Sequence, residues 1–176
     1  NGVPRIGPVV INELMYNPDV GVEFIELKNI SGAAVSLADP PNPDPLAVVP
    51  AWKFTDGVTF SFPAGATLPV GGFALVLPQP TSGFENFEAF AADFRSTNSG
   101  PGNVTIYGPY DGKLKNGGEP VEISRPGNVE LDGTLPDVLI DRVNYDNSAP
   151  WPVEPAGGGP SLSRFVSADF GNDVIN

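Results

Sequence analysis

The chain has 176 residues, of which 21 are acidic and 9 are basic, giving a formal net charge of -12. This balance argues against nucleic acid or an anionic membrane surface as the main partner, because both are met by clustered Lys and Arg. The absence of cysteine excludes disulfides and thiolate chemistry, and the absence of histidine removes the commonest general base. With 21 glycines, 21 prolines and 40% hydrophobic residues, we expect many short strands separated by tight turns.

The first part of the chain predicts a β-hairpin. Two apolar segments, 9–16 and 22–30, flank a turn rich in Asn, Pro, Asp and Gly. In the second segment Ile25 and Leu27 share one face, whereas Glu26 lies on the other. The register between the two strands stays open, because a slip of one residue moves every side chain to the opposite face.

The next part predicts strands separated by a long proline-rich loop. Residues 39–50 contain five prolines, and proline cannot donate to a sheet ladder, so we expect this segment to be an exposed loop. The dipeptide Asp56-Gly57 predicts a hairpin turn. The strands expected around these features are 34–37, 52–54, 58–62 and 73–77.

One helix is predicted, over residues 83–94. Ser82 and Glu85 have the spacing of a capping box, in which Ser82 begins the helix and Glu85 reaches back. Apolar residues then recur at helical spacing, which favours a helix that covers a core over one that lines a ligand groove. These residues are Phe84, Phe87, Phe90, Ala91 and Phe94.

The last third of the chain predicts four more strands, which completes an all-β pattern. About nine or ten short strands at this turn spacing are typical of a β-sandwich. The strands expected here are 103–107, 120–124, 138–145 and 161–166.

An ordered series of short motifs resembles the lamin tail domain family in its bacterial, exported form. The resemblance runs from about residue 9 to residue 164, within a single domain of residues 1–176. The motifs that carry it are Val10 to Leu14, Tyr16 to Pro18, Glu23 to Asn29, Val35 to Leu37, Trp52 to Phe54, Phe62 to Leu68, Leu114 to Glu119, Ile140 to Tyr145, Trp151-Pro152 and Gly159 to Arg164.

The resemblance implies an immunoglobulin-like β-sandwich with no known catalytic residues. In animals such a domain is the globular tail of nuclear intermediate filaments, and in bacteria it is a module of large exported proteins. The animal role does not transfer, because the chain has no heptad rod and no C-terminal lipidation motif. Two segments look enlarged relative to the family, at about 39–50 and 78–102, and the second holds the predicted short helix.

Acidic residues suggest one candidate metal site. Calcium prefers carboxylate and carbonyl oxygens, and Asp19 and Glu23 of the first hairpin are the first candidates for binding it. The alternative is a solvated acidic face, since no Asp-x-Asp-x-Asp-Gly loop is present. Glu13 and Glu26 would face each other in only one register, so a surface role or a salt bridge to Lys28 or Arg164 is favoured over glycosidase chemistry.

Four aromatic residues offer a second kind of site. Trp52, Trp151, Tyr107 and Tyr110 could stack on sugars if their faces were exposed. The alternative is packing, in which Trp52 opens a strand inside the sandwich and Trp151 plugs one end of it.

Together these features favour a non-catalytic interaction or structural module of an exported or cell-surface bacterial protein. The alternatives are a calcium-dependent carbohydrate-binding module and an accessory domain of a neighbouring hydrolase. The expected partner is a protein or an extracellular polysaccharide, held by an exposed edge strand or by the two enlarged segments. The sequence predicts neither nucleic-acid binding by this domain nor insertion into a membrane.

Overall fold

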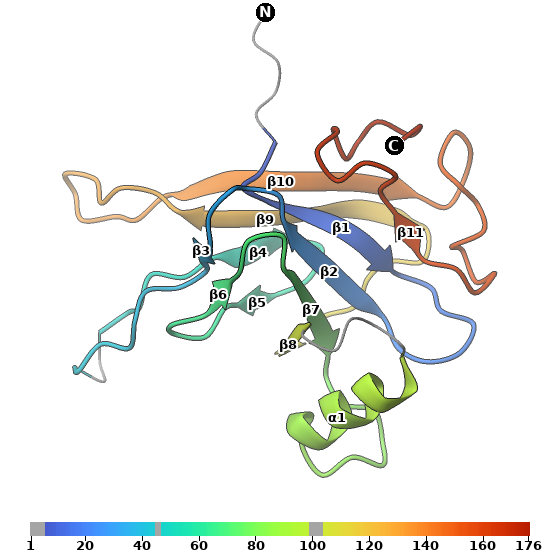
Figure 1. Cartoon of the computed structure of the whole chain (residues 1–176), viewed down its shortest axis with the longest axis horizontal. Coiled ribbons are helices and arrows are strands. Elements are labelled where there is room, and N and C mark those ends of the chain that lie inside the picture. The colour runs from blue at the N-terminus through green and yellow to red at the C-terminus, as the bar shows by residue number, and fades with distance from the viewer. Residues whose placement is uncertain (1–5, 45–46, 99–103) are drawn as a thin grey trace, which may run out of the picture.

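The computed structural model describes residues 6–44, 47–98 and 104–176. Within these ranges the chain forms eleven strands and one helix (Figure 1). In chain order they are β1 (Val9–Met15), β2 (Phe24–Asn29), β3 (Val35–Ser36), β4 (Lys53–Asp56), β5 (Phe60–Ser61), β6 (Thr67–Leu68), β7 (Phe73–Pro78), α1 (Phe87–Thr97), β8 (Thr105–Tyr110), β9 (Gly118–Pro126), β10 (Asp137–Asp146) and β11 (Leu162–Ser163).

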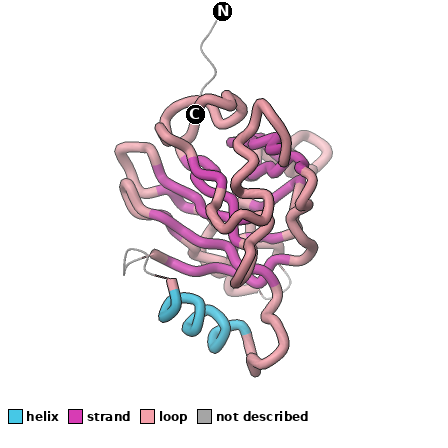
Figure 2. The backbone as a smooth tube through the Cα atoms, turned by 90° about the vertical axis from the view of Figure 1, so that its right-hand side faces the viewer, coloured by secondary structure: helices cyan, strands magenta, loops and turns pink. Residues whose placement is uncertain are grey.

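Two sheets stack on each other, and α1 lies outside them (Figure 2). The larger sheet has the order β11-β1-β2-β7-β8 and is antiparallel except for the parallel pair β7 and β8. The smaller sheet has the order β10-β9-β4-β5 and is antiparallel throughout. A two-stranded ribbon of β3 and β6 completes the structure. β1 contacts β10 along one side, and β5 contacts β8 along the other.

The alternation of apolar residues places the main core between the sheets. Ile25 and Leu27 of β2 are fully buried in it, as the sequence predicted, and Glu26 points from the opposite face. The smaller sheet contributes Phe54, Ile123 and other alternate residues from its inner face. The fold is therefore an immunoglobulin-like β-sandwich with one short helix, as expected. Among the described helical residues, no segment is long and apolar enough to cross a membrane.

A β-bulge in β1 fixes the register of the first hairpin. Ile11 pairs with Leu27, but the next pair along the strand is Glu13 with Glu26, so Asn12 is the extra residue. Glu13 and Glu26 therefore face each other across neighbouring strands. The regular alternation of β2 gives no sign of this bulge, which lies in its partner strand.

The helix begins later than the sequence predicted. Asn86, not Ser82, is the N-cap, because its Oδ1 accepts a hydrogen bond of 2.9 Å from the Ala89 amide. Gly83 has a φ of +114°, outside the helical region, so the chain is still turning where the capping box predicted the first turn. At the other end, the helix continues three residues past Phe94 to Thr97.

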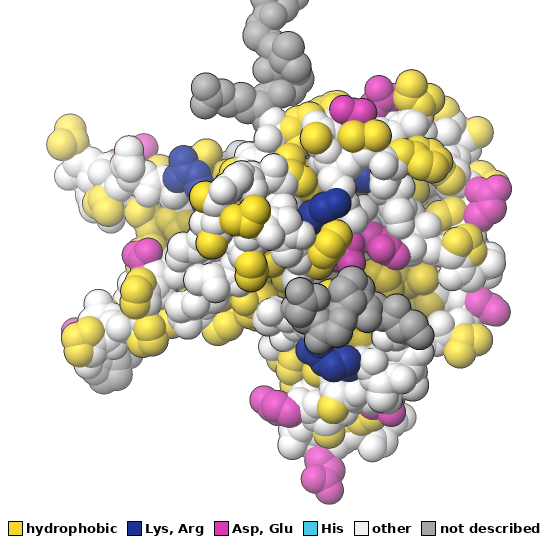
Figure 3. Space-filling model, viewed as in Figure 1, with side chains coloured by type: hydrophobic (Ala, Val, Ile, Leu, Met, Phe, Trp, Pro, Cys, Tyr) yellow, Lys and Arg dark blue, Asp and Glu magenta, His cyan; other side chains and the backbone are white. Residues whose placement is uncertain are grey.

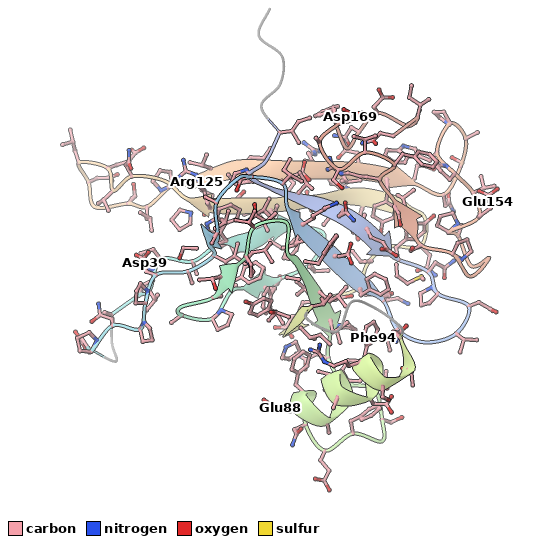
Figure 4. All side chains as sticks on the ribbon, viewed as in Figure 1. Asp39, Glu88, Phe94, Arg125, Glu154 and Asp169 are labelled. Carbon is pink, nitrogen blue, oxygen red and sulfur yellow. The ribbon has the colours of Figure 1, made fainter. Side chains whose placement is uncertain are left out.

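Helix α1 covers the outer face of the larger sheet. Phe90 and Phe94 pack with Leu77 of β7 in a second, smaller core, and Phe94 lies on the side of α1 that faces the sheet (Figure 4). Arg95 donates to the carbonyl of Val104, which ties the helix to the residue before β8. The prediction of a helix that covers a core is confirmed, and the helix belongs to the crossover between parallel strands β7 and β8.

Several predicted boundaries differ from those observed. The expected strand 161–166 is reduced to β11, since the chain turns away after Arg164. The short strand β6 was not predicted, and Asn103, the predicted start of β8, lies outside the described residues. In the proline-rich segment 39–50, residues 39–44 are exposed loop, as predicted, and residues 45–46 lie outside the described residues. Residues 47–50 are also loop, but apart from Val48 they are half-buried. That loop and the β9–β10 turn both project at the left of Figure 1, away from the C-terminal loops.

Candidate functional site

A buried ion pair stands at the edge of the sandwich where β1 meets β10. Arg164 Nη2 lies 2.6 Å from Asp141 Oδ2, and the two side chains are 5% and 6% exposed. The Ile11 amide donates to the same Asp141 oxygen at 2.7 Å, and Arg164 Nε donates to the Ile11 carbonyl at 2.7 Å. Both backbone groups of Ile11 are thus satisfied by the ion pair.

The bulge in β1 explains why this pair lies here. A bulge interrupts the ladder of hydrogen bonds, and buried backbone groups left without partners are costly. Asp141 supplies an acceptor for Ile11 next to the bulge residue Asn12, and the Arg164 amide donates to the Asn12 carbonyl at 3.0 Å. The ion pair therefore binds β1, β10 and the chain after β11 together.

The C-terminal segment, defined here as residues 165–176, folds back over this edge. Arg164 Nη1 donates to the Asp169 carbonyl at 2.7 Å, and the Asn144 amide of β10 donates to Asn172 Oδ1 at 2.5 Å. Gly171 packs so closely on Arg164 that a side-chain carbon there would collide with the guanidinium group. Figure 4 places Asp169 on the loops beside β10, on the side of the molecule that also carries Glu154.

Between β11 and the C-terminal segment lies a cavity of about 300 Å³, called the edge cavity below. Its walls are mainly apolar side chains from β1, β10, β11, the loop after β10 and the C-terminal segment. They include Leu14, Val143, Trp151, Leu162, Phe165 and Val174. Phe165 is 88% exposed, and other apolar side chains of the C-terminal segment are exposed as well. Figure 3 shows apolar side chains at the upper right of the molecule, where Figure 1 places β11 and the C-terminal loops.

Of the facing pair Glu13 and Glu26, only Glu13 lines the edge cavity. Glu13 lines it and accepts a hydrogen bond from the Ser161 hydroxyl, while Glu26 accepts one of 2.8 Å from Asn12 Nδ2. Burial raises the pKa of Glu26, the hydrogen bond from Asn12 lowers it, and the Glu13 charge raises it further. Among the described residues neither glutamate has a salt bridge. Of the alternatives drawn from the sequence, the salt bridges to Lys28 and Arg164 are therefore wrong, and Asp141 holds the Arg164 guanidinium instead.

The two calcium candidates have different surroundings. Asp19 is exposed in the turn between β1 and β2. The Glu23 carboxylate is mostly buried and accepts hydrogen bonds from the Leu114 amide at 3.1 Å and the Tyr110 hydroxyl at 3.3 Å. Lys113 Nζ lies 3.8 Å from it. Within the described residues, no three acidic side chains gather as metal ligands. Calcium binding at Asp19 and Glu23 is a hypothesis from the sequence alone, and Glu23 already anchors the loop after β8 through these hydrogen bonds.

Burial raises the pKa of Glu23, and three groups counter this effect by favouring the charged carboxylate. These are the Leu114 amide, the Lys113 ammonium and the Tyr110 hydroxyl. Glu119 also holds this loop, because it accepts a hydrogen bond from the Lys115 amide at 2.8 Å and pairs with Lys115 Nζ at 3.1 Å. These interactions assign the two glutamates to holding the β8–β9 loop.

The candidate aromatic residues separate into buried and accessible ones. Trp52 and Tyr110 are buried in the main core, so the packing alternative holds for both. Tyr107 is half-buried against Phe62 and donates to the Thr67 carbonyl at 3.3 Å. Trp151 packs against the end of the core, as the plug prediction proposed, and also lines the edge cavity.

Sequence reasoning missed Asp141 and Arg164 as a pair. Both occur in motifs noted above, but 22 residues separate them and neither motif shows its partner. One available signal was position: Asp141 is an acidic residue between Ile140 and Val143 of an apolar strand, and such a residue is buried only with a partner.

Comparison with known proteins identifies the family but not a close relative. A model of the family described as Lamin Tail Domain matches residues 3–147. No curated protein matches the chain. The matched part includes β1 and β10, whereas Trp151, β11 and the C-terminal segment follow it. The edge cavity is therefore built partly from matched residues and partly from residues that follow the match. Because the match spans well over half of the sequence, the chain belongs to the lamin tail domain family.

Proposed function

We propose that this immunoglobulin-like domain is a non-catalytic interaction module of an exported bacterial protein, and that it holds its partner in the edge cavity. The observation that carries the proposal is the cavity itself: about 300 Å³, with apolar walls and Trp151 accessible in one of them. Binding sites of this kind combine apolar walls with a few polar groups that fix the orientation of the ligand.

The ionisable groups support binding rather than catalysis. Asp141, Glu23 and Glu119 hold backbone amides or basic side chains, which gives each a role in the fold. Glu13 reaches the edge cavity, whereas Glu26 is held by Asn12 on the neighbouring strand. The pair therefore does not flank a common cleft as the two carboxyls of a glycosidase do.

Export is supported by two features of the sequence. The motifs resemble the bacterial, exported form of the family, and the net charge of -12 suits a domain that stays in solution without adhering to nucleic acid. A partner protein or an extracellular polysaccharide is then the natural ligand class.

Carbohydrate binding is the second candidate, and Trp151 favours it. Trp151 lines the cavity together with Asn12, Glu13 and Ser161, so the lining offers both an indole ring for stacking and polar groups for hydrogen bonds to a sugar. This candidate and the protein-binding one share the edge cavity but differ in ligand.

The test is to map binding on the ¹⁵N-labelled domain by NMR, using a panel of soluble peptides and oligosaccharides. We expect a ligand to shift the amides of β1, β11 and the C-terminal segment, and Trp151→Ala to abolish the shifts. Val20→Ala is the matched control, because Val20 is 89% exposed in the β1–β2 turn. Shifts confined to another surface, or no shifts with any probe, would overturn the proposal.

A further inference from the structure

We infer that the edge cavity receives a peptide segment of a partner protein in which a lysine or arginine stands beside an apolar side chain. This inference rests on the proposed function and specifies the ligand. It begins from the apolar walls, where Trp151, Leu162 and Val143 offer surface to an apolar side chain. Pro152, Pro155 and Pro160 also line the cavity and supply no backbone N–H donor.

The size of the cavity sets how much of a partner it can take. Ligand pockets in proteins range from about 300 to 1,000 Å³, so a cavity of about 300 Å³ is at the small end. It suits one or two side chains of an extended segment better than the face of a folded domain. The cavity also lies beside β11, a two-residue edge strand, where an extended segment has access.

The charge of the cavity lining indicates that the ligand also carries a positive charge. Glu13, Glu154 and Asp173 line the cavity, and within the described residues none of them takes part in a salt bridge. The one basic residue of the lining, Arg164, is held by Asp141 and is 5% exposed. The unpaired charge at the cavity is therefore negative, and it is complementary to a cation.

The strand pairing strengthens this choice of a cation. Glu13 stands directly opposite Glu26, and like charges in that position repel each other. A lysine or arginine beside Glu13 would offset this repulsion and form a charge-assisted hydrogen bond. A neutral sugar supplies hydrogen bonds without neutralising the charge, so the lining favours a peptide.

The experiment uses capped tripeptides with leucine at both ends and lysine, glutamine or glutamate in the centre, titrated into the ¹⁵N-labelled domain. We expect the lysine peptide to shift the amides of β11 and the C-terminal segment, with a Kd about tenfold below that of the glutamine peptide. The glutamate peptide should bind most weakly, and raising NaCl from about 0.05 to about 0.5 M should reduce the preference for lysine.

Variants of the cavity lining test whether its carboxylates cause the preference for the lysine peptide. The triple variant Glu13→Gln/Glu154→Gln/Asp173→Asn, which removes all three carboxylates of the lining, should equalise the Kd values of the lysine and glutamine peptides. Glu130→Gln is the matched control, since it removes one carboxylate in the exposed β9–β10 loop and should leave the preference unchanged. The spectrum of each variant without peptide reports whether it is folded.

The outcomes separate this inference from the proposed function. Equal affinities for all three peptides at the edge cavity would overturn the cation and leave the interaction module standing. Shifts of the same amides by oligosaccharides but by no peptide would overturn the peptide inference and support carbohydrate binding. If neither peptides nor oligosaccharides shift these amides, both proposals fail.

Discussion

Glu13 and Glu26 lie directly opposite each other on β1 and β2, a register set by the bulge at Asn12. Cross-strand pairs of like charge destabilise a sheet. The sheet holds this pair through hydrogen bonds from Ser161 to Glu13 and from Asn12 to Glu26. The unpaired negative charge at this edge is thus a property of the fold.

We predict that Glu26→Gln stabilises the domain at neutral pH, by about 0.2–1 kcal/mol, because it removes the like charge and keeps an acceptor for Asn12. Burial raises the folded-state pKa of Glu26 above its ordinary value of 4.5. Between these two values the folded chain binds more protons, so the Glu26 contribution to the free energy of unfolding falls as pH rises through that window.

Urea unfolding from pH 4 to pH 8 measures this effect. The gain from Glu26→Gln should be present above the raised pKa and vanish toward pH 4, whereas Glu130→Gln should show no comparable pH dependence. A Glu26→Gln variant that is less stable than the wild type at pH 7 would contradict the prediction.

We predict that breaking the buried pair is strongly destabilising. Asp141→Leu or Arg164→Met alone should lower the free energy of unfolding by about 3–5 kcal/mol, because each leaves a buried charge without its partner. The double variant should lose less than the sum of the single variants. Lys53→Met is the control: its pair with Asp137 is 41% exposed on both sides and should be worth about 1 kcal/mol or less. Additive losses in urea unfolding would exclude coupling between Asp141 and Arg164.

We predict that Asn86→Ala destabilises the domain by about 1 kcal/mol, because it removes the bond from the Ala89 amide to the N-cap. Ser82→Ala should change stability little, since Ser82 lies four positions before the observed N-cap, Asn86. Thermal unfolding of both variants compares the observed cap with the capping-box motif. Equal losses would mean that the helix begins earlier in solution.

We predict that calcium leaves the melting temperature unchanged, because Glu23 already accepts bonds from Leu114 and Tyr110. The measurement compares thermal unfolding in EDTA and in millimolar CaCl₂ at constant ionic strength. A ligand at a hundred times its Kd adds about 2.7 kcal/mol, which raises the melting temperature by several degrees for a domain of this size. A rise that Asp19→Asn and Glu23→Gln abolish would establish the calcium site.

Local patterns predicted the fold well where the signal is short-range. The alternation of Ile25 and Leu27 identified the core face of β2. Asp56-Gly57 marked the β4–β5 hairpin, but the two-residue turn that this dipeptide predicted is wrong, because Phe54 pairs with Phe60. The predicted start of the helix was wrong because the segment 82–86 contains two residues that can act as an N-cap, Ser82 and Asn86. Ser82 has the motif, but the positive φ of Gly83 delays the first turn until Asn86.

The candidate site was harder to predict, since its parts meet only in the folded chain. Trp151 was correctly placed at an end of the core, but the cavity beside it needs β1, β10 and the C-terminal segment. The Asp141–Arg164 pair depends on a bulge in β1 that satisfies no local sequence rule. Register and bulges are set by partner strands, so one strand's pattern does not reveal them.

The parallel pairing of β7 and β8 makes the segment between them indispensable. Parallel neighbours start at the same end of a sheet, so the chain must travel back along β7, which at six residues is about 20 Å long. No tight turn covers that return, and α1 provides it while burying Phe90 and Phe94. A deletion that joined Pro78 directly to Thr105 would therefore do more than remove a surface loop. β8 could then pair with β7 only in the antiparallel direction or would leave the sheet, so any shortening of this region to a tight turn requires a different topology at that edge.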